Sequence, residues 1–204
     1  MLSITLGPMC AGKTSSMINT YRSCVGKKII IDFDIDNNTK CFWGHVNTHD
    51  NVKEESIKAT KLFDTLDIYN VNGNFQMASE YFHEYKYTDA PELYKMHDTV
   101  KFSEHIFINE AQFFPDLYEF VTKYSNKNIY LYGLDGDFKR EKIGQIIDLI
   151  PLCDSVIKLN SICVCGKNAI FTHRDSLETE QYVPNATYTP LCRACYLKKI
   201  NKTD

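Results

Sequence analysis

The first fourteen residues, Met1–Thr14, read MLSITLGPMCAGKT. The apolar run 1–6 predicts a short buried strand, and 7–14 fits the pattern G-x-x-x-x-G-K-[ST]. Glycines near both ends of such a loop permit backbone angles and close approaches that a side chain would block. The amide groups of the loop then turn inward as a cradle for anions, and the helix that follows adds its N-terminal dipole. This stretch therefore predicts a strand, a phosphate-binding loop and a helix over about 14–24.

Every residue of this loop is a candidate ligand of a nucleoside triphosphate. The ammonium group of Lys13 would reach the β- and γ-phosphates, and the hydroxyl of Thr14 would ligate Mg²⁺. The alternative is a chance glycine turn before a helix, which the agreement of strand, loop and helix disfavours. The candidate ATP-binding residues are Gly7, Pro8, Met9, Cys10, Ala11, Gly12, Lys13 and Thr14.

Length and composition bound the class of the protein. A chain of 204 residues can build one substantial core and a small appendage. Its net charge of −3 argues against bulk electrostatic binding to nucleic acid. The apolar runs are too short to span a bilayer, and no secretory signal precedes the first strand. We therefore expect a cytoplasmic protein with no membrane partner.

Strands and helices alternate after the loop. The runs 28–33, 106–108 and 128–133 predict further strands, and Pro115 suits the start of a helix that continues to about Tyr124. This alternation predicts an α/β fold with a mostly parallel sheet flanked by helices.

Other parts of the chain are harder to read. The stretch 34–50 lacks periodicity and predicts a loop, and 70–74 carries a turn signal. Helices are compatible with the patterns at 53–66, 78–87, 91–96 and 144–150. From Ser155 onward the pattern changes to short β-like pieces between cysteine pairs. We therefore expect an α/β nucleotide-binding domain at 1–151, with an unusually long region at 51–104, and a small β-rich domain at 152–204.

A carboxylate follows the strand at 106–108. Ligands of parallel sheets collect at the carboxyl ends of the strands, so Glu110 is the candidate general base; the alternative is a solvated surface acid. Asn109 can hydrogen-bond a metal-bound water but brings no negative charge, so Asn109→Asp is expected to raise activity or Mg²⁺ affinity. Exposed aromatic rings at Phe113 and Phe114 would suit a planar ligand.

Four of the eight cysteines form two pairs near the C-terminus. Cys192 and Cys195 form a C-x-x-C pair, and Cys163 and Cys165 form a pair that is one residue tighter. Thiolates at such spacing can converge on one tetrahedral Zn²⁺, and four of them leave no open position for catalysis. We therefore expect a structural zinc site; the alternative is four unrelated thiols. The candidate metal ligands are Cys163, Cys165, Cys192 and Cys195.

Together these stretches resemble the type II thymidine kinases, the family found in animal cytosol, many bacteria and large DNA viruses. The match is good at the start and from Glu110 to Lys199, and poor from Ile35 to Glu104. The resemblance rests on GPMCAGKT at 7–14, NEAQFFPDLYEF at 109–120, GLDGDFKR at 133–140, IPLCDSVIKL at 150–159, AIFTHR at 169–174 and LCRACYLKK at 191–199.

The resemblance implies an enzyme that transfers the γ-phosphoryl group of ATP to the 5′-hydroxyl of thymidine with Mg²⁺, in deoxynucleoside salvage. It implies a P-loop α/β core, a zinc-bearing lasso domain that closes over the nucleoside, and a homotetramer or homodimer. If the source is viral, the location is the host cytoplasm. By motif match, Glu110 accepts the hydroxyl proton, and Thr14 and Asn109 lie near Mg²⁺. The implied substrate-binding residues are Met9, Phe113, Leu134, Thr172, Arg174 and Tyr188.

The chain departs from the family pattern at four places. Asn109 stands where the family has aspartate, Asn38 stands where it has an arginine near the phosphates, the lasso glycines are replaced around 183–185, and the segment from His49 to Glu104 is longer. The first two departures weaken the charge balance around Mg²⁺ and phosphate. They leave open a catalytically weak or inactive homologue that acts as a nucleotide- or nucleoside-binding regulatory protein. A phosphate-loop ATPase whose zinc module contacts nucleic acid is disfavoured by the acidic pI of about 6.1.

Overall fold

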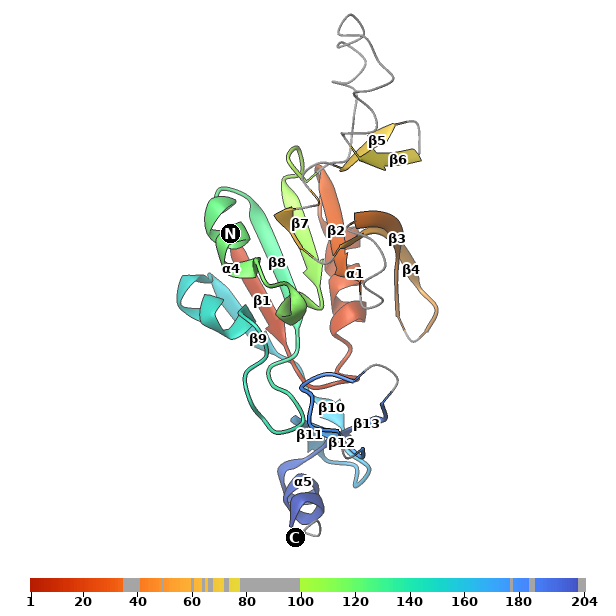
Figure 1. Cartoon of the computed structure of the whole chain (residues 1–204), viewed down its shortest axis with the longest axis vertical. Coiled ribbons are helices and arrows are strands. Elements are labelled where there is room, and N and C mark those ends of the chain that lie inside the picture. The colour runs from red at the N-terminus through yellow and green to blue at the C-terminus, as the bar shows by residue number, and fades with distance from the viewer. Residues whose placement is uncertain are drawn as a thin grey trace, which may run out of the picture.

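A central sheet of seven strands organises the computed structural model, in the order β3-β4-β2-β7-β8-β1-β9 (Figure 1). Neighbouring strands are parallel, except that β3 and β4 pair in antiparallel fashion. The expected α/β class with a parallel-rich sheet is therefore confirmed. The strands are β1 (Leu2–Leu6), β2 (Lys28–Phe33), β3 (Cys41–Asn47), β4 (Lys53–Ala59), β7 (His105–Asn109), β8 (Asn128–Gly133) and β9 (Ser155–Lys158). The structure describes residues 1–34, 41–48, 50–59, 61–63, 65, 68–71, 74–77, 100–176, 178–183 and 186–201.

Helices cover both faces of this sheet. On one face, α1 (Lys13–Ser23) packs Met17 and Ile18 against Ile30 and Phe107. The opposite face carries the larger core, which includes Ile29, Ile31 and the apolar side of α4. Because consecutive residues of β2 are buried on opposite faces, this strand is a continuous apolar run, as a covered parallel strand requires. The elements on the second face are η3 (Ala111–Phe113), α4 (Leu117–Lys123) and η4 (Ile146–Leu152).

Two expectations for the region after β2 were wrong. The stretch 34–50 is not all loop, because β3 occupies 41–47, and 53–66 does not begin as a helix, because β4 occupies 53–59. Lysine, glutamate and alanine favour helices locally, but β4 is held between β3 and β2, with Ile57 and Ala59 fully buried. Tertiary pairing therefore overrides the local preference.

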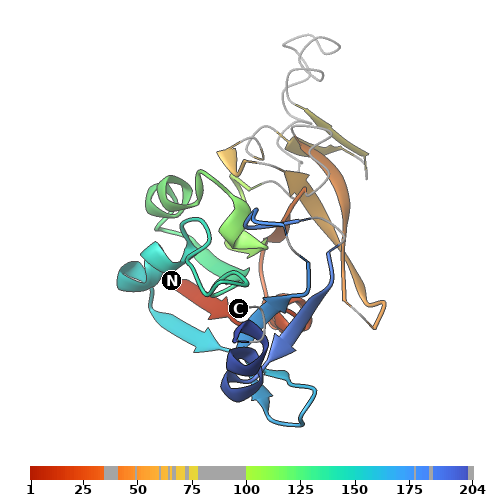
Figure 2. The same cartoon turned by 60° about the horizontal axis from the view of Figure 1, so that its bottom comes forward.

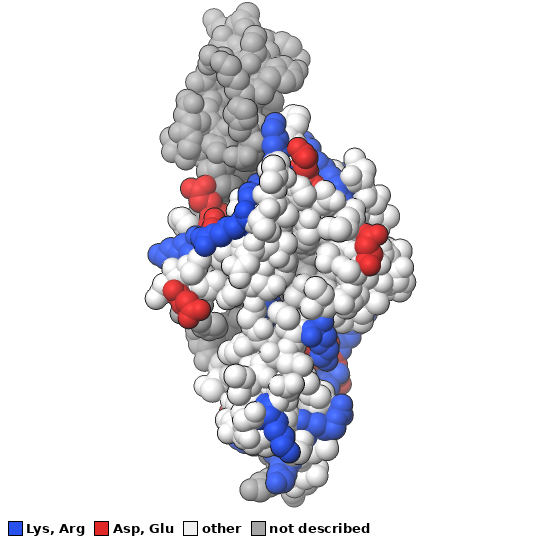
Figure 3. All heavy atoms as spheres, turned by 180° about the vertical axis from the view of Figure 1, so that it is seen from behind, with Lys and Arg blue, Asp and Glu red and all other residues white. Residues whose placement is uncertain are grey.

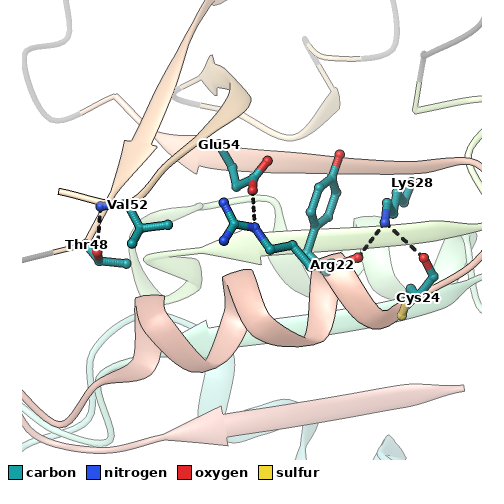
Figure 4. A network of polar contacts seen from close by, with 7 residues as sticks. Arg22, Cys24, Lys28, Thr48, Val52 and Glu54 are labelled. Carbon is teal, nitrogen blue, oxygen red and sulfur yellow. Dashed lines mark hydrogen bonds and ion pairs between the residues drawn. The ribbon is translucent and has the colours of Figure 1, made fainter. Parts of the chain in front are cut away.

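Contacts with α1 fasten the β3–β4 hairpin to the rest of the sheet (Figure 4). Arg22, in the last turn of α1, forms an ion pair with Glu54 of β4. Beyond the end of β3, the amide of Val52 donates to the hydroxyl of Thr48 at 3.1 Å, which closes the hairpin turn. Lys28 of β2 donates to the Cys24 carbonyl and so caps the carboxyl end of the helix.

The other boundaries agree with the sequence to within a few residues. The helix expected at 115–124 begins two residues later, and the one expected at 144–150 is a 3₁₀ helix, η4, that continues through Pro151. The turn signal at 70–74 lies between β5 (Ile68–Val71) and β6 (Asn74–Met77), which pair in antiparallel fashion. The helices expected at 78–87 and 91–96 lie outside the described residues.

A small module lies at the carboxyl ends of the sheet strands (Figure 2). The hydroxyl of Tyr196 in this module donates to the carbonyl of Phe138, which lies after β8. β9 follows the expected boundary at 151/152 yet pairs with β1 in the central sheet, so the chain leaves the sheet only after Lys158. The division into two domains stays a prediction. The module contains β10 (Ser161–Ile162), β11 (Asn168–Ala169), β12 (Phe171–Arg174), β13 (Tyr188–Leu191) and α5 (Arg193–Ile200).

Helix α4 offers a direct test of the larger core. Phe120 is fully buried there, whereas Tyr118, on the same helix, is 43% exposed. Phe120→Ala is expected to lower the free energy of unfolding by about 3–5 kcal/mol, because it removes a buried ring and leaves a cavity. Tyr118→Ala should change it by about 0.5 kcal/mol or less. Urea denaturation of both variants checks this, and equal losses would contradict the assignment of the buried face.

Candidate active site

The loop 7–14 connects β1 to α1 at the carboxyl edge of the sheet. Cys10 and Gly12 adopt left-handed backbone angles, with φ of 58° and 77°, which turn the chain sharply. A side chain at Gly7 would place its Cβ 2.7 Å from the carbonyl oxygen of Leu159, so only glycine fits this approach to the end of β9. Helix α1 begins at Lys13, immediately after Gly12. The loop and the first turn of the helix thus form a shape suited to an anion.

Lys13 lies folded back across this loop. Its ammonium group donates to the carbonyl oxygens of Gly7 at 3.2 Å and Pro8 at 2.8 Å, and the residue is only 8% exposed. Burial lowers the pKa of Lys13, while the carboxylates of Glu110 and Asp135 oppose that shift. A buried cation whose pKa is perturbed in this way marks a candidate functional site, and its charge would suit an anionic ligand.

Glu110 follows the last residue of β7 and has a left-handed backbone conformation, with φ of 48°. Its carboxylate accepts a hydrogen bond from the Gln112 amide at 2.7 Å. Burial raises the pKa of Glu110, whereas the nearby Lys13 and the bond from Gln112 lower it. The raised pKa brings the carboxyl closer to the range in which a general base works.

Gln112 links two strand ends and was not singled out from the sequence. Besides its bond to Glu110, its side-chain oxygen accepts from the amide of Leu134 at 3.0 Å. A side chain at Gly144, whose φ is 53°, would place its Cβ 1.9 Å from the Gln112 carbonyl oxygen. Glycine at position 144, just before η4, therefore leaves room for Gln112, which holds Glu110. No local pattern signals this, because the contacts join residues far apart in the sequence.

The aromatic residues after Glu110 divide between core and site. Phe113 is partly exposed, but Phe114 is fully buried and packs edge-on against Phe33 at 5.2 Å. The expectation that both rings are exposed was wrong for Phe114. The tight turn of η3 sends the two adjacent side chains to different environments, which the sequence alone does not reveal.

Asn109 is the last residue of β7 and is 5% exposed. Its amide nitrogen donates to a carboxylate oxygen of Asp32 at 2.9 Å, and Asp32 also pairs with the ammonium group of Lys58. The position expected to lie near Mg²⁺ is therefore held by β2 and β4.

A cavity of about 540 Å³ opens over the loop 7–14. It brings Lys13, Thr14 and Glu110 to one space, together with Asn47 and Thr48 from the end of β3, which were not expected there. Its volume suits a nucleotide-sized ligand. The lining residues are Met9, Cys10, Ala11, Gly12, Lys13, Thr14, Ser15, Asn47, Thr48, Glu110, Ala186 and Tyr188.

A second, much smaller hollow adjoins the first and shares Met9 and Tyr188 with it. Five of the six substrate-binding residues implied by the resemblance line it, namely Met9, Phe113, Leu134, Thr172 and Tyr188. Tyr182, which the sequence did not suggest, packs edge-on against Phe113 at 4.9 Å and lies parallel to Tyr188 at 6.5 Å. Aromatic and apolar residues of this kind can pack against a planar ring, although the hollow between them has a volume of only about 10 Å³.

The sixth residue, Arg174, has a different environment. Its guanidinium group lies 3.8 Å from the centre of the Phe138 ring and donates to the carbonyl oxygens of Glu178 and Glu180. It does not appear among the described residues that line either hollow. Arg174 therefore braces the segment after β12, which carries Tyr182 toward the smaller hollow.

The four candidate metal ligands come together in the small module. The sulfur atoms of Cys163, Cys165, Cys192 and Cys195 all lie within 4.8 Å of one another. Gly166, with φ of 79°, makes the tight turn between β10 and β11 that aligns the first pair. Backbone amides of Cys165 and Cys192 lower the pKa of the Cys163 thiol to about 6, which favours a thiolate. The cluster could hold a metal ion.

Comparison with known proteins identifies the family. A sequence profile of the thymidine kinase family matches residues 67–196. The thymidine kinase of vaccinia virus (strain Western Reserve) is 32% identical to this chain, over 96% of each protein. The chain belongs to the thymidine kinase family. The prediction of a type II thymidine kinase enzyme is thus confirmed.

Two other relatives show how the likeness is distributed. The thymidine kinase of Oryza sativa is 31% identical over 96% of this chain and 66% of its own length. The cytosolic thymidine kinase of Gallus gallus is 43% identical, but over only 45% of this chain. The family profile begins at residue 67, so the loop 7–14 lies outside it. Within the described residues, none of the helices is long and apolar enough to cross a membrane.

The environment of Glu110 predicts a stability that depends on pH. A carboxyl whose pKa is raised in the folded state stabilises the fold at low pH, and this contribution is lost as the pH rises through the raised pKa. Glu110→Gln removes the charge, so its melting temperature should exceed that of the parent by an amount that grows as the pH rises above 4.5. Melting curves across this range, without nucleotide, check this. Glu119→Gln, on exposed α4 surface, serves as the control, and a constant difference for Glu110→Gln would contradict the burial argument.

Proposed function

We propose that the protein is an ATP-dependent thymidine kinase that transfers the γ-phosphoryl group of ATP to the 5′-hydroxyl of thymidine. The observation that carries this is the position of Glu110 in the larger cavity with Lys13 and Thr14, beside an aromatic hollow that shares Met9 and Tyr188. The larger cavity suits the triphosphate, and the aromatic residues around the smaller hollow would contact the pyrimidine. That hollow has a volume of only about 10 Å³, so its walls would have to separate to admit the base. The relatives' names supply the substrate.

The protein's own groups would bind and orient the two substrates. The loop amides and Lys13 would bind the phosphates, and Glu110 would accept the proton of the attacking hydroxyl while Gln112 holds its carboxylate. The backbone amide of Met9 donates a hydrogen bond to the Thr172 hydroxyl at 3.0 Å, so the walls of both hollows are linked. The segment 178–183 would exclude water from the transfer, which protects ATP from hydrolysis.

Mg²⁺ fits the donor set at this edge. Thr14 and Glu110 line the same cavity, and hydroxyl and carboxylate oxygens are hard donors that suit Mg²⁺. Thr14 would hold the ion, and Asn109 would accept from a water bound to it. When bound, Mg²⁺ supplies neutralisation of the phosphate charge during transfer.

Zn²⁺ fits the cysteine cluster. The sulfur atoms of Cys165 and Cys192 are 3.6 Å apart, close to the edge of about 3.8 Å that four Zn–S bonds of about 2.3 Å would give. We propose that Cys163, Cys165, Cys192 and Cys195 hold one structural zinc ion. The metal would support a module whose buried core consists of a few residues around Leu191 and Tyr196.

The remaining expectations concern partners and location. A homotetramer or homodimer and a cytoplasmic location are proposals, supported by family membership and by the name of the chicken relative. On the face in Figure 3, charged side chains of both signs lie among uncharged residues, and Lys and Arg prevail over the lower part. This is compatible with the proposal that the protein does not bind nucleic acid through bulk charge.

A nucleotide-binding regulatory homologue with little turnover is the second candidate. The observation that favours it is Asn109, which brings no charge to the strand end. Asn38, the other departure, lies outside the described residues. Thymidine-dependent release of ADP separates the candidates, because the kinase needs the nucleoside, an ATPase does not, and the binding protein releases nothing.

Glu110→Gln tests the proposed base. We expect kcat to fall roughly 10²–10⁴-fold, the usual contribution of a general base, while thymidine affinity changes much less. Coupled measurement of ADP production across thymidine concentrations checks this, with Glu119→Gln as the matched control. A parent that releases ADP with thymidine and a Glu110→Gln variant that does so equally fast would exclude the base role.

Removal of zinc tests the cysteine cluster. Elemental analysis of protein purified without chelator is expected to find one zinc per chain, and Cys192→Ser should reduce it. Loss of the metal should speed amide hydrogen exchange in 160–201 more than in β1, β7 and β8, because the module has little core of its own. Cys153→Ser, outside the cluster, is the control, and a metal-free parent with a protected module would contradict the assignment.

A further inference from the structure

Three polar residues form a row across neighbouring strands at the carboxyl edge of the sheet. Asp32 of β2 lies directly opposite Lys58 of β4 on one side and Asn109 of β7 on the other. Directly opposed residues project to the same face of a sheet. Ile30 and Phe107, two residues earlier in β2 and β7, pack against α1, so the row lies on the face that α1 covers.

Hydrogen bonding fixes the orientation of each member of this row. An ionised carboxylate only accepts, so the amide nitrogen of Asn109 faces Asp32, at 2.9 Å, and its carbonyl oxygen must face away from Asp32. Lys58 forms an ion pair with the other oxygen of the Asp32 carboxylate. Asp32 and Asn109 are each 5% exposed, so neither is free to exchange this contact for water.

This arrangement accounts for asparagine at position 109. A second carboxylate there would lie about as close to Asp32 as the present amide does, 2.9 Å away. Two buried carboxylates at that distance cannot both stay ionised, and one would retain its proton. The Asn109 side chain instead donates a hydrogen bond to Asp32. The carboxylate of the row therefore lies on β2 and not on β7.

The charge of Asp32 reaches the proposed catalytic residue. Burial is the main cause of the raised pKa of Glu110; Lys13 and Gln112 oppose it, Asp32 adds to it, and Lys58, the partner of Asp32, offsets part of that addition. Glu110 is adjacent in sequence to Asn109, so the row ends at the site. Asp32 lies on a different strand from Glu110. It nevertheless contacts Asn109, the residue directly before Glu110.

We propose that Asp32 is a positioning residue: it orients Asn109 at the end of β7 and supplies from β2 the carboxylate charge that position 109 lacks. This rests on the proposed function only in linking the row to Mg²⁺ and nucleotide. Asn109 and Asp32 are then a matched pair: the carboxylate that position 109 lacks stands on β2, where Lys58 pairs with it. The expectation from sequence, that Asn109→Asp simply adds a missing charge, is replaced by one in which it also creates a like-charge contact.

The first experiment tests the pair without nucleotide or metal. Melting temperatures of the full-length parent, Asn109→Asp and two double variants are measured in EDTA across pH 5 to 8. Asn109→Asp should lose stability as the pH rises, because the carboxylate pair holds a proton in the folded state that it must release. Asp32→Asn/Asn109→Asp should remove this loss.

Asp34→Asn/Asn109→Asp is the matched control. Asp34 is also 5% exposed, lies two residues after Asp32 and carries the same charge, but one of its carboxylate oxygens has no partner among the described residues. This variant should keep the pH-dependent loss. If both double variants relieve the loss equally, the effect is one of net charge, and the proposed contact is overturned.

The second experiment tests the role at the site by calorimetric titration of ADP with and without Mg²⁺. Mg²⁺ is expected to raise the affinity of the parent for ADP. In Asp32→Asn this gain should be roughly 10–100-fold smaller, the usual effect of losing a group that supports a metal site. The exchanged variant Asp32→Asn/Asn109→Asp should restore most of it, because one carboxylate again stands in the row. An unchanged Mg²⁺ effect in Asp32→Asn, or no recovery on exchange, would overturn the proposal.

The two experiments also separate this proposal from the proposed function. If the parent binds ADP with Mg²⁺ and the exchange restores that effect, yet thymidine releases no ADP, the kinase proposal fails and the assignment of Asp32 stands. If the parent releases ADP with thymidine but the Asp32 variants behave as the Asp34 control does, the kinase proposal stands and the assignment of Asp32 fails.

Discussion

The parallel pairing of β2, β7, β8 and β1 is the constraint on which the site depends. Parallel strands end at the same edge, so the loop after β1, Glu110 after β7 and Leu134 after β8 meet there although they lie far apart in the sequence. Gln112 then joins two of these ends through its bonds to Glu110 and Leu134. Any change in strand order or register would separate the groups that the cavity brings together.

This edge holds groups whose burial does not favour the fold. Burial lowers the pKa of Lys13 and raises that of Glu110, so each is less stable as a charged group than it would be in water. Their mutual attraction offsets part of this, and the large apolar core on the other face of the sheet supplies the stability that tolerates it. The protein keeps its reactive groups where a polar ligand would satisfy them.

The sequence predicted those parts of the site that local pattern specifies. The loop 7–14, the strand before Glu110 and the paired cysteines each carry spacing that few other structures use, and the structure brings the four sulfur atoms together. The β3–β4 hairpin was missed, because its residues favour a loop and a helix locally and become strands only by pairing with β2. The contact of Asp32 with Asn109 is of the same kind: it depends on register between strands, which no single stretch of sequence records.

The position of Lys13 has a consequence for the energetics of binding. Its ammonium group has two acceptors within the protein, the carbonyl oxygens of Gly7 and Pro8. An arriving phosphate would not fill an unsatisfied site; it would displace the loop's own oxygens in an exchange of partners. The net gain is then the difference between a charge-assisted bond and the neutral ones given up, which is smaller than the number of new contacts suggests. Lys13 thus holds the loop in shape through the same contacts that a bound phosphate would displace.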